Sequence, residues 1–216
     1  MIALIINYNR LTLAKQTADW CFAHGLTPIF VDNHSDYTPL LEYYRDCPYQ
    51  IYRLNENRGH TVISTLDLKK LFGIDGRFIV TDPDLDFTGI PDDFLSVLNQ
   101  GLDKFPAYLK CGFSLETRDL PDSAEGNFIR NHAEASYWLR PLNQLYFDAP
   151  IDTTFALYRG AYKKHFVRQS IRTNRPYTAR HISWYYTDYS TMVEDEKYYF
   201  KTANASASGK KRMKLQ

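Results

Sequence analysis

Four short apolar runs, each ending in polar residues, limit what this chain can fold into more than any other feature. The runs are IALII at 2–6, TPIFVDN at 27–33, QIYRL at 50–54 and RFIVTD at 77–82. The first run shows no polar alternation, which is typical of a strand covered on both faces. Helical segments separate the runs, and this repetition predicts a parallel, doubly wound sheet with right-handed crossovers.

The helical segments carry start and stop signals. Thr12 is the expected N-cap of the first helix, and Gly25 is its expected stop. Further helices are expected at 39–44, from the polar loop 55–60 to about Phe72, and from Pro91 to Lys104. The predicted fold class is therefore α/β, a single domain with a mostly parallel central sheet flanked by helices. In such sheets ligands bind beyond the carboxyl ends of the strands, where the four polar clusters would gather.

Composition bounds the class of protein. A chain of 216 residues with 44% apolar and 24% charged residues is expected to bury one core. No stretch approaches the ~20 apolar residues of a membrane helix, so a soluble, cytoplasmic protein without a membrane span is expected. The three cysteines contain no CxxC pair, which favours buried thiols over a disulfide framework or a zinc site.

The basic residues are unevenly distributed. Five of the 26 lysines and arginines, and none of the 25 acids, lie in residues 201–216. The rest of the chain is slightly acidic, which argues against a nucleic-acid partner. Residues 201–216 are predicted to be a disordered tail or a linker toward further domains.

The sequence TDPDLD places three acids, Asp82, Asp84 and Asp86, directly after a buried run. A solvated turn is the ordinary explanation of such acids. Here Pro83 stiffens the turn and presents the carboxylates at a defined spacing. A divalent cation would remove their mutual repulsion and leave coordination sites for substrate phosphates. The expected ligand is a nucleoside diphosphate with its cation.

These motifs together resemble a known family. FIVTDPDLDF, VDNHSDYTPLLEYY and NENRGH resemble the nucleotide-binding half of GT-A fold glycosyltransferases similar to family 2, in which a DxD motif ends the central strand. DAPIDTTFALYR and PYTARHISWYY look like the acceptor half, so the resemblance covers residues 1–200. The chain is also similar to the amino-terminal domain of chlorella-virus glycosyltransferases that build capsid glycans.

The resemblance implies a nucleoside site at the first two strand ends and a diphosphate contact at the third. The implied residues are Asn7, Asn9, Arg10, Asp32, Asn33, Arg58, Gly59, His60 and Asp82. Asn can pair with a uracil edge, an acid can accept from ribose hydroxyls, and a cationic side chain can meet diphosphate. Turn residues that satisfy their own backbone, an exposed surface charge at Arg10 and an exposed helix cap at His60 are the alternatives.

The implied cation is Mn²⁺ or Mg²⁺, held by Asp82, Asp84 and His181. A neutral imidazole beside two carboxylates suits Mn²⁺. His181 packed structurally beside Trp184 is the alternative, and a shifted register in which Asp84 and Asp86 form the functional pair also stays open.

Transfer of a sugar also needs a group that takes the acceptor proton. Asp152 and Asp148 are the candidate general bases, with Asp152 preferred because its DTTF context carries the resemblance. A capping role for either acid is the alternative. No Glu-Asp pair of the kind frequent in inverting members is found, so the stereochemistry is open. The candidate acceptor platform comprises Trp138, Tyr146, Trp184, Tyr185 and Tyr186.

The resemblance implies a metal-dependent hexosyl- or deoxyhexosyltransferase that uses a UDP-sugar and a glycan or glycoprotein acceptor, in the host cytoplasm if the chain is viral. Two rivals remain. A sugar-nucleotide nucleotidyltransferase would carry a Gly-rich loop after the first strand, whereas NYNRLTLAK has no Gly. A non-catalytic carbohydrate-binding domain of the same fold would bind without turnover.

Overall fold

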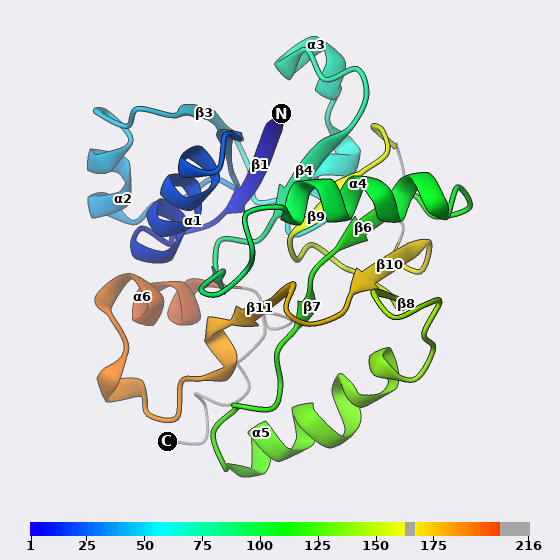
Figure 1. The fold of residues 1–216 in the computed structure, drawn as a ribbon. Helices are drawn as coiled ribbons and strands as arrows, with labels where there is room; N and C mark the ends of the chain where they lie inside the picture. The colour runs from blue at the N-terminus through cyan, green and yellow to red at the C-terminus, as the bar shows by residue number, and fades with distance from the viewer. Residues whose placement is uncertain (163–166, 204–216) are drawn as a thin grey trace.

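The computed structural model describes residues 1–162 and 167–203. Its first half repeats strand and helix, and all strand pairs within that half are parallel, in the order β3-β2-β1-β4. Figure 1 shows this half with α1 beside β1 and with α2 on the far side of α1. The elements are β1 (Ile2–Asn7), α1 (Thr12–Ala23), β2 (Thr27–Asp32), α2 (Thr38–Tyr43), β3 (Gln50–Arg53), η1 (Val62–Thr65), α3 (Leu68–Phe72) and β4 (Phe78–Thr81).

The second half extends the sheet and adds a small one. Its elements are β5 (Leu85–Asp86), α4 (Phe94–Lys104), β6 (Lys110–Gly112), β7 (Ser114–Leu115), α5 (Ala124–Phe128), η2 (Ile129–Ala133), η3 (Ala135–Trp138), β8 (Tyr146–Asp148), β9 (Ala156–Tyr158), β10 (Ser170–Thr173), β11 (Thr178–His181), η4 (Ile182–Trp184), η5 (Tyr189–Thr191) and α6 (Glu194–Thr202). Strand β9 pairs antiparallel with β4 and β6, which completes an eight-stranded sheet in the order β3-β2-β1-β4-β9-β6-β10-β8. The described strands β5, β11 and β7 form a separate sheet. The predicted α/β class with a mostly parallel sheet is confirmed.

Alternate residues of β1 point to opposite faces of the sheet and belong to three buried clusters. Ala3 belongs to the cluster that α4 covers, and Ile5 packs with residues of α1. Leu4 and Ile6 belong to the cluster beneath η1 and α3. This strand is therefore buried on both faces, as its unbroken apolar run predicts.

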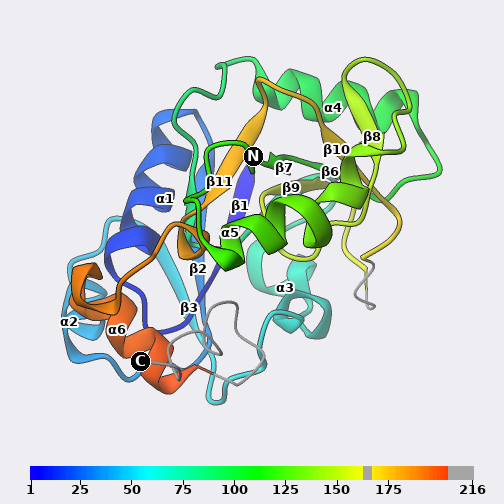
Figure 2. The ribbon, with the colours of Figure 1, turned by 90° about the horizontal axis from the view of Figure 1, so that it is seen from below.

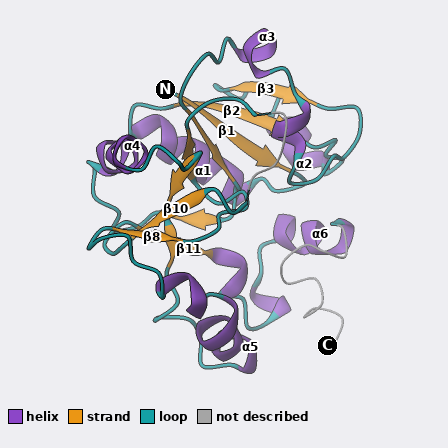
Figure 3. Ribbon diagram, turned by 90° about the vertical axis from the view of Figure 1, so that its right-hand side faces the viewer, coloured by secondary structure: helices purple, strands orange, loops and turns teal. Residues whose placement is uncertain are grey.

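Helices α5 and α6 lie beyond the carboxyl ends of β1 and β4. Figures 1 and 3 agree on this placement, and Figure 2 looks from that side. The space between these helices and the strand ends is where the sheet geometry predicts a ligand site.

Three local expectations are wrong. The N-cap of α1 is Leu11, and the first amides of the helix are capped from α6 rather than by Thr12. The helix expected up to Phe72 is split, because η1 ends at Thr65 and a new helix, capped by the Asp67 side chain, begins at Leu68. The segment LKCGFSL at 109–115, which follows the expected helix to Lys104 and is expected from its sequence to form one strand, divides at Phe113 into β6 and β7, which pair in different sheets.

The chain end is described only in part. Lys201 and Thr202 continue α6, whereas the rest of the predicted tail, 204–216, lies outside the described residues. Within the part of the chain that is described, no helix combines the length and the apolar character needed to cross a membrane.

Candidate functional site

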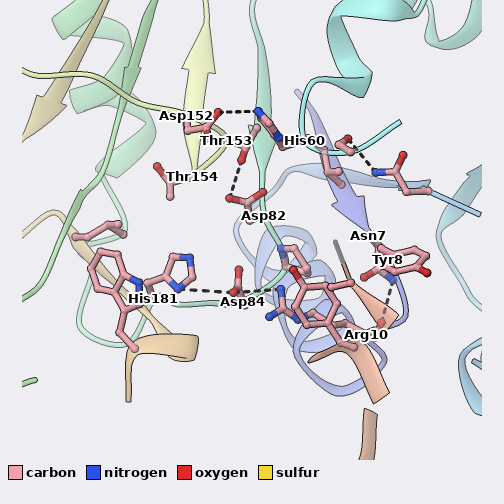
Figure 4. Close-up of a pocket in the computed structure, with 18 of the residues that line it drawn as sticks. Asn7, Tyr8, Arg10, His60, Asp82, Asp84, Asp152, Thr153, Thr154 and His181 are labelled. Carbon is pink, nitrogen blue, oxygen red and sulfur yellow. Dashed lines mark hydrogen bonds and ion pairs between the residues drawn. The ribbon is translucent and has the colours of Figure 1, made fainter. Parts of the chain in front are cut away.

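A cavity of about 480 Å³ opens at the carboxyl ends of β1 and β4. Its size falls within the range of small-molecule sites in proteins. The loops after β1 and β3 line one end, the TDPD turn lines the middle, and residues from the second half line the other end (Figure 4). The polar clusters predicted to gather there therefore meet around a single space.

Two of the three acids of the TDPDLD motif line this cavity. Asp82 accepts a hydrogen bond from the Thr153 hydroxyl at 2.9 Å. The Asp84 side chain is 4% exposed, and its Oδ2 lies 3.1 Å from Arg10 Nη1 and 3.6 Å from His181 Nδ1. Ser183 Oγ donates to the same oxygen at 2.5 Å.

The third acid, Asp86, does not line the cavity. Its Oδ1 accepts from the backbone N–H and the hydroxyl of Thr88, at 2.8 Å and 2.6 Å, and so closes a turn. The strand β5 begins at Leu85 and directs this carboxylate toward Arg180 on β11, where Oδ2 lies 3.9 Å from Nη1. Asp82 and Asp84 therefore border the cavity, whereas Asp86 lies outside its lining.

The two cavity carboxylates differ in their electrostatics. Burial and the charge of Asp84 raise the pKa of Asp82 to about 7, although the hydrogen bond from Thr153 opposes the shift. Burial would also raise the pKa of Asp84, but the nearby Arg10 and His181 lower it to about 2. Asp84 is therefore ionised at neutral pH, while Asp82 can exchange a proton with the surroundings.

Arg10 is held in this position by the last described helix. Its Nε and Nη2 donate to the two carboxylate oxygens of Glu196 at 2.8 Å and 3.2 Å. The guanidinium carbon lies 3.6 Å from the centroid of the Tyr199 ring. Both contacts come from α6, so a residue near the start of the chain is positioned by residues almost two hundred positions later.

The predicted nucleoside end is built by the loops after β1, β2 and β3. Asn7 donates to the Arg10 carbonyl and to the Tyr44 hydroxyl, both at 2.9 Å, and its Oδ1 has no hydrogen-bond partner among the described residues. Asn33 donates to the Gly59 carbonyl at 3.1 Å. Gly59 adopts φ +67°, a left-handed conformation that favours glycine and brings its backbone to the cavity edge.

Four predicted residues lie away from the cavity lining. Asn9 binds the backbone amides of Asp36 and Tyr37 through Oδ1. Asp32 accepts from the Ser35 amide at 3.0 Å and contacts Arg53 Nε at 3.2 Å.

The other two form ion pairs at the surface. Arg58 Nε lies 3.0 Å from Glu56 Oε1, and Asp148 Oδ2 lies 2.5 Å from Arg140 Nη2. In the structure Asn9 and Asp32 therefore bond to loop backbone. Arg58 and Asp148 form ion pairs outside the cavity lining.

Asp152 and His60 face each other across the cavity mouth. Asp152 Oδ1 lies 3.9 Å from His60 Nε2, and the two side chains are 56% and 57% exposed (Figure 4). The backbone carbonyl of Asp152 is held in place, because it accepts a hydrogen bond from Lys110 Nζ at 2.8 Å. Of the two candidate bases, Asp152 alone lines the cavity.

His181 and Trp184 form the wall beside Asp84. Their rings stack with centroids 4.8 Å apart and planes 11° from parallel. Of the five aromatic residues predicted for an acceptor platform, Trp184 lines the cavity, whereas the other four lie elsewhere in the described chain. His181 is thus packed against Trp184 and close to Asp84 at the same time.

Several cavity residues were not predicted from the sequence. Thr153 and Thr154 stand in the DTTF segment, where the sequence points only to the acid. Arg172 and Tyr199 lie in segments without a recognisable motif. Glu134 and Tyr137 lie in the segment from α5 to η3, which carries no recognisable motif either.

The side chains fit a cation only if a ligand completes its coordination. Among the described residues no group of three or more His, Cys, Asp or Glu side chains is arranged to hold a metal ion. Asp84 and His181 form a close pair, and Asp82 faces the same cavity. A site with few protein ligands is normal for cations that bridge to substrate phosphates.

Comparisons with known proteins add little about activity. No protein-family model and no curated protein matches the chain. Among solved structures, the apo form of mouse xyloside xylosyltransferase 1 is similar over 74% of this chain and 67% of that chain, with 11% sequence identity and a TM-score of 0.34. A likeness this distant does not bear on activity, so the function rests on the geometry of the cavity.

Proposed function

We propose that this chain is a metal-dependent glycosyltransferase that moves a sugar, a hexose or deoxyhexose, from a UDP-sugar to a hydroxyl of a glycan or glycoprotein. The observation that carries the proposal is the convergence of Asp82, Asp84 and Asp152 on one cavity, with the loops after β1 and β3 at its other end. This arrangement supports a nucleotide at one end, a cation in the middle and the reacting sugar beside Asp152.

The nucleoside end supplies groups that can read a base. Asn7 offers a buried amide oxygen that lacks a partner in the described chain, and a uracil N–H is a suitable donor to it. Asn33 and the Gly59 backbone border the same space and would contact the ribose and phosphates. The assignment of uracil follows from the resemblance of the sequence motifs and from this single acceptor.

The middle of the cavity would hold Mn²⁺ or Mg²⁺ on Asp84, His181 and Asp82, together with diphosphate oxygens. Bound there, the cation would stabilise the negative charge that grows on the leaving diphosphate. Arg10 lies against Asp84 and would contribute a fixed positive charge at the same place. Its hydrogen bonds to Glu196 fix the orientation of the guanidinium.

Asp152 is placed to act on the acceptor. As the bond between the anomeric carbon and the phosphate oxygen breaks, the acceptor oxygen bonds to that carbon and its proton passes to the Asp152 carboxylate. His60 lies close enough to orient this carboxylate. This role applies to an inverting transfer, whereas a retaining transfer would use Asp152 for binding.

The test is thermal unfolding with UDP, GDP and CMP, each with and without Mn²⁺. A ligand that binds only the native state stabilises it by ~2.7 kcal/mol at a hundredfold excess over Kd. We expect stabilisation by UDP that requires Mn²⁺, disappears in Asp84→Asn and persists in Asp86→Asn. Asp86 is the matched control because it belongs to the same motif but faces away from the cavity.

Two outcomes would contradict the proposal. If no nucleotide stabilises the protein, the chain has no donor site. If Asp84→Asn and Asp86→Asn lose the stabilisation by UDP equally, the motif acts through folding. Binding of a UDP-sugar without turnover with any glycan acceptor would instead favour a carbohydrate-binding domain.

A further inference from the structure

We propose that the end of the cavity opposite the nucleoside loops is a site for a neutral sugar ring, and that it discriminates against rings that carry a carboxylate. The site is formed by Glu134, Thr154 and Arg172, which we call the far wall. This inference rests on the proposed function and deepens it, because it names the class of sugar that the cavity accepts.

The far wall is built around a buried ion pair. Arg172 Nη1 lies 2.7 Å from Glu134 Oε2, and the two side chains are 6% and 9% exposed. Arg172 Nε donates to the Pro150 carbonyl at 2.7 Å, and the guanidinium carbon lies 4.5 Å from the centroid of the Tyr137 ring. These contacts come from two separate segments, one containing Glu134 and Tyr137 and the other containing Pro150, and together they fix the orientation of the Arg172 guanidinium.

Each partner of the pair keeps one polar atom for a ligand. Arg172 Nη2 and Glu134 Oε1 take no hydrogen-bond partner from the described residues. Both residues line the cavity. The pair therefore offers a ligand one donor and one acceptor, and sugar hydroxyl groups can satisfy both, since each hydroxyl both donates and accepts.

Thr154 provides an independent indication of a ligand. Its side-chain oxygen is buried and has no hydrogen-bond partner among the described residues. The residue is 8% exposed and lines the same cavity, on the side of Asp152 and Thr153 (Figure 4). A buried hydroxyl without a partner carries a desolvation cost that a ligand hydroxyl would remove.

The charges of this end favour a neutral ring. The positive charge of Arg172 is already balanced by Glu134, and Asp152 adds a second carboxylate at the cavity mouth. A uronate placed against Arg172 would lie close to Glu134 and would be repelled by it. Trp184 supplies an aromatic surface on the same cavity for the C–H face of a ring.

The experiment compares UDP, UDP-glucose and UDP-glucuronate by isothermal titration calorimetry with Mn²⁺, on the full chain. The readout is the ratio of each sugar nucleotide's affinity to that of UDP, because this ratio isolates the contribution of the sugar to binding. We expect UDP-glucose to bind more tightly than UDP-glucuronate by at least about tenfold. Thr154→Val should lower the UDP-glucose ratio by about threefold to tenfold while the affinity for UDP stays unchanged.

A variant that changes the charge of the far wall should change the preference between a neutral and a charged sugar. A purely structural role of Glu134 would not change this preference. Glu134→Gln removes the repulsion and leaves the Arg172 charge unbalanced, so the ratio of UDP-glucuronate to UDP-glucose affinity should rise by about tenfold. Glu42→Gln, on the exposed side of α2, is the matched control and should leave all ratios unchanged. If Glu134→Gln fails to fold, the Thr154→Val result decides.

A second arm separates this inference from the proposed function and separates a donor sugar from an acceptor sugar. Methyl glucoside and methyl glucuronide are tested without nucleotide by saturation-transfer NMR. Signals from the glucoside that are lost in Thr154→Val would support the site even if UDP does not bind. Three outcomes would overturn the proposed sugar site. They are a preference for the glucuronide in either arm, affinity ratios that stay unchanged in Thr154→Val and Glu134→Gln, and the absence of any sugar contribution to binding in both arms.

Discussion

Arg10 Nη1 lies 3.1 Å from Asp84 Oδ2, and both side chains are almost completely buried. The Nε and Nη2 edge of the guanidinium is bound by Glu196 on α6. The carboxylate proposed to bind a cation is thus already balanced by a fixed positive charge. Arg10 would hold this part of the cavity together when no cation is bound.

Replacing Arg10 should therefore destabilise the protein most strongly in the absence of metal. Arg10→Met leaves two buried carboxylates without their partner, and such a loss costs about 3–5 kcal/mol. Mn²⁺ should recover part of this loss, since it can balance Asp84. Urea unfolding with and without Mn²⁺ measures both effects. Arg77→Met is the control, because Arg77 pairs with the exposed Asp103 and should cost about 1 kcal/mol or less.

The acids at the start of α6 should differ sharply in their effect on stability. Asp195 Oδ2 accepts from the backbone N–H groups of Leu11 and Thr12 at 2.7 Å and 2.6 Å, so Asp195→Ala should lower the free energy of unfolding by about 2 kcal/mol. Among the residues that the structure describes, the neighbouring Glu194 pairs only with Lys197, and its side chain is 79% exposed. Glu194→Ala should change stability by less than about 0.5 kcal/mol. Similar losses in both variants, measured by chemical denaturation, would refute the capping role.

Lys110 should make the protein more stable as the pH rises above 8. Burial lowers the pKa of this amine to about 8, against the attraction of Asp152. Between about 8 and 10.5 the unfolded chain binds the proton and the native chain does not, so unfolding becomes less favourable with rising pH. The gain should be on the order of 2–3 kcal/mol across this window. Comparison with Lys110→Met isolates the effect, and parallel pH profiles of the two proteins would contradict it.

Substitution of Asp152 and of Asp148 should distinguish a catalytic carboxylate from a structural one. In an inverting transfer, Asp152→Asn should lower kcat by about 10²–10⁴-fold, since it removes the proton acceptor while leaving the nucleotide end intact. Asp148→Asn should leave kcat nearly unchanged, because its carboxylate pairs with Arg140 outside the cavity lining. Unchanged kcat in Asp152→Asn would assign this residue to binding rather than proton transfer. UDP affinity, measured alongside, should be equal in both variants.

The sheet was predictable where strand burial leaves a simple signal. The apolar run at β1 is covered on both faces, and its residues alternate between the buried clusters on the two sides of the sheet. The placement of β9 was not predictable in direction, since a short apolar segment such as FALY fits a parallel or an antiparallel neighbour equally well. The split after Thr65 depends on the local cap at Asp67, a signal weaker than the apolar spacing around it.

The site was predictable where a motif constrains the backbone. The TDPD turn directs Asp82 and Asp84 into the cavity, as its stiff proline suggests. By contrast, Glu134 and Arg172 are 38 positions apart and meet only because β10 and the segment after α5 converge. No spacing rule along the chain connects two such residues. Asn9 and Asp32 illustrate the opposite case, since the sequence resemblance implies a nucleoside contact and their side chains bond to loop backbone outside the cavity lining.

The contact between Arg10 and α6 also sets an order of events during synthesis. The first strand and the TDPD turn leave the ribosome long before Glu196 and Tyr199, which hold the Arg10 guanidinium. Until α6 emerges, the amides at the start of α1 lack the Asp195 carboxylate and Arg10 lacks its anchor. A nascent chain therefore carries every residue of the TDPD turn without a finished pocket, and the cavity takes its final form only when α6 docks.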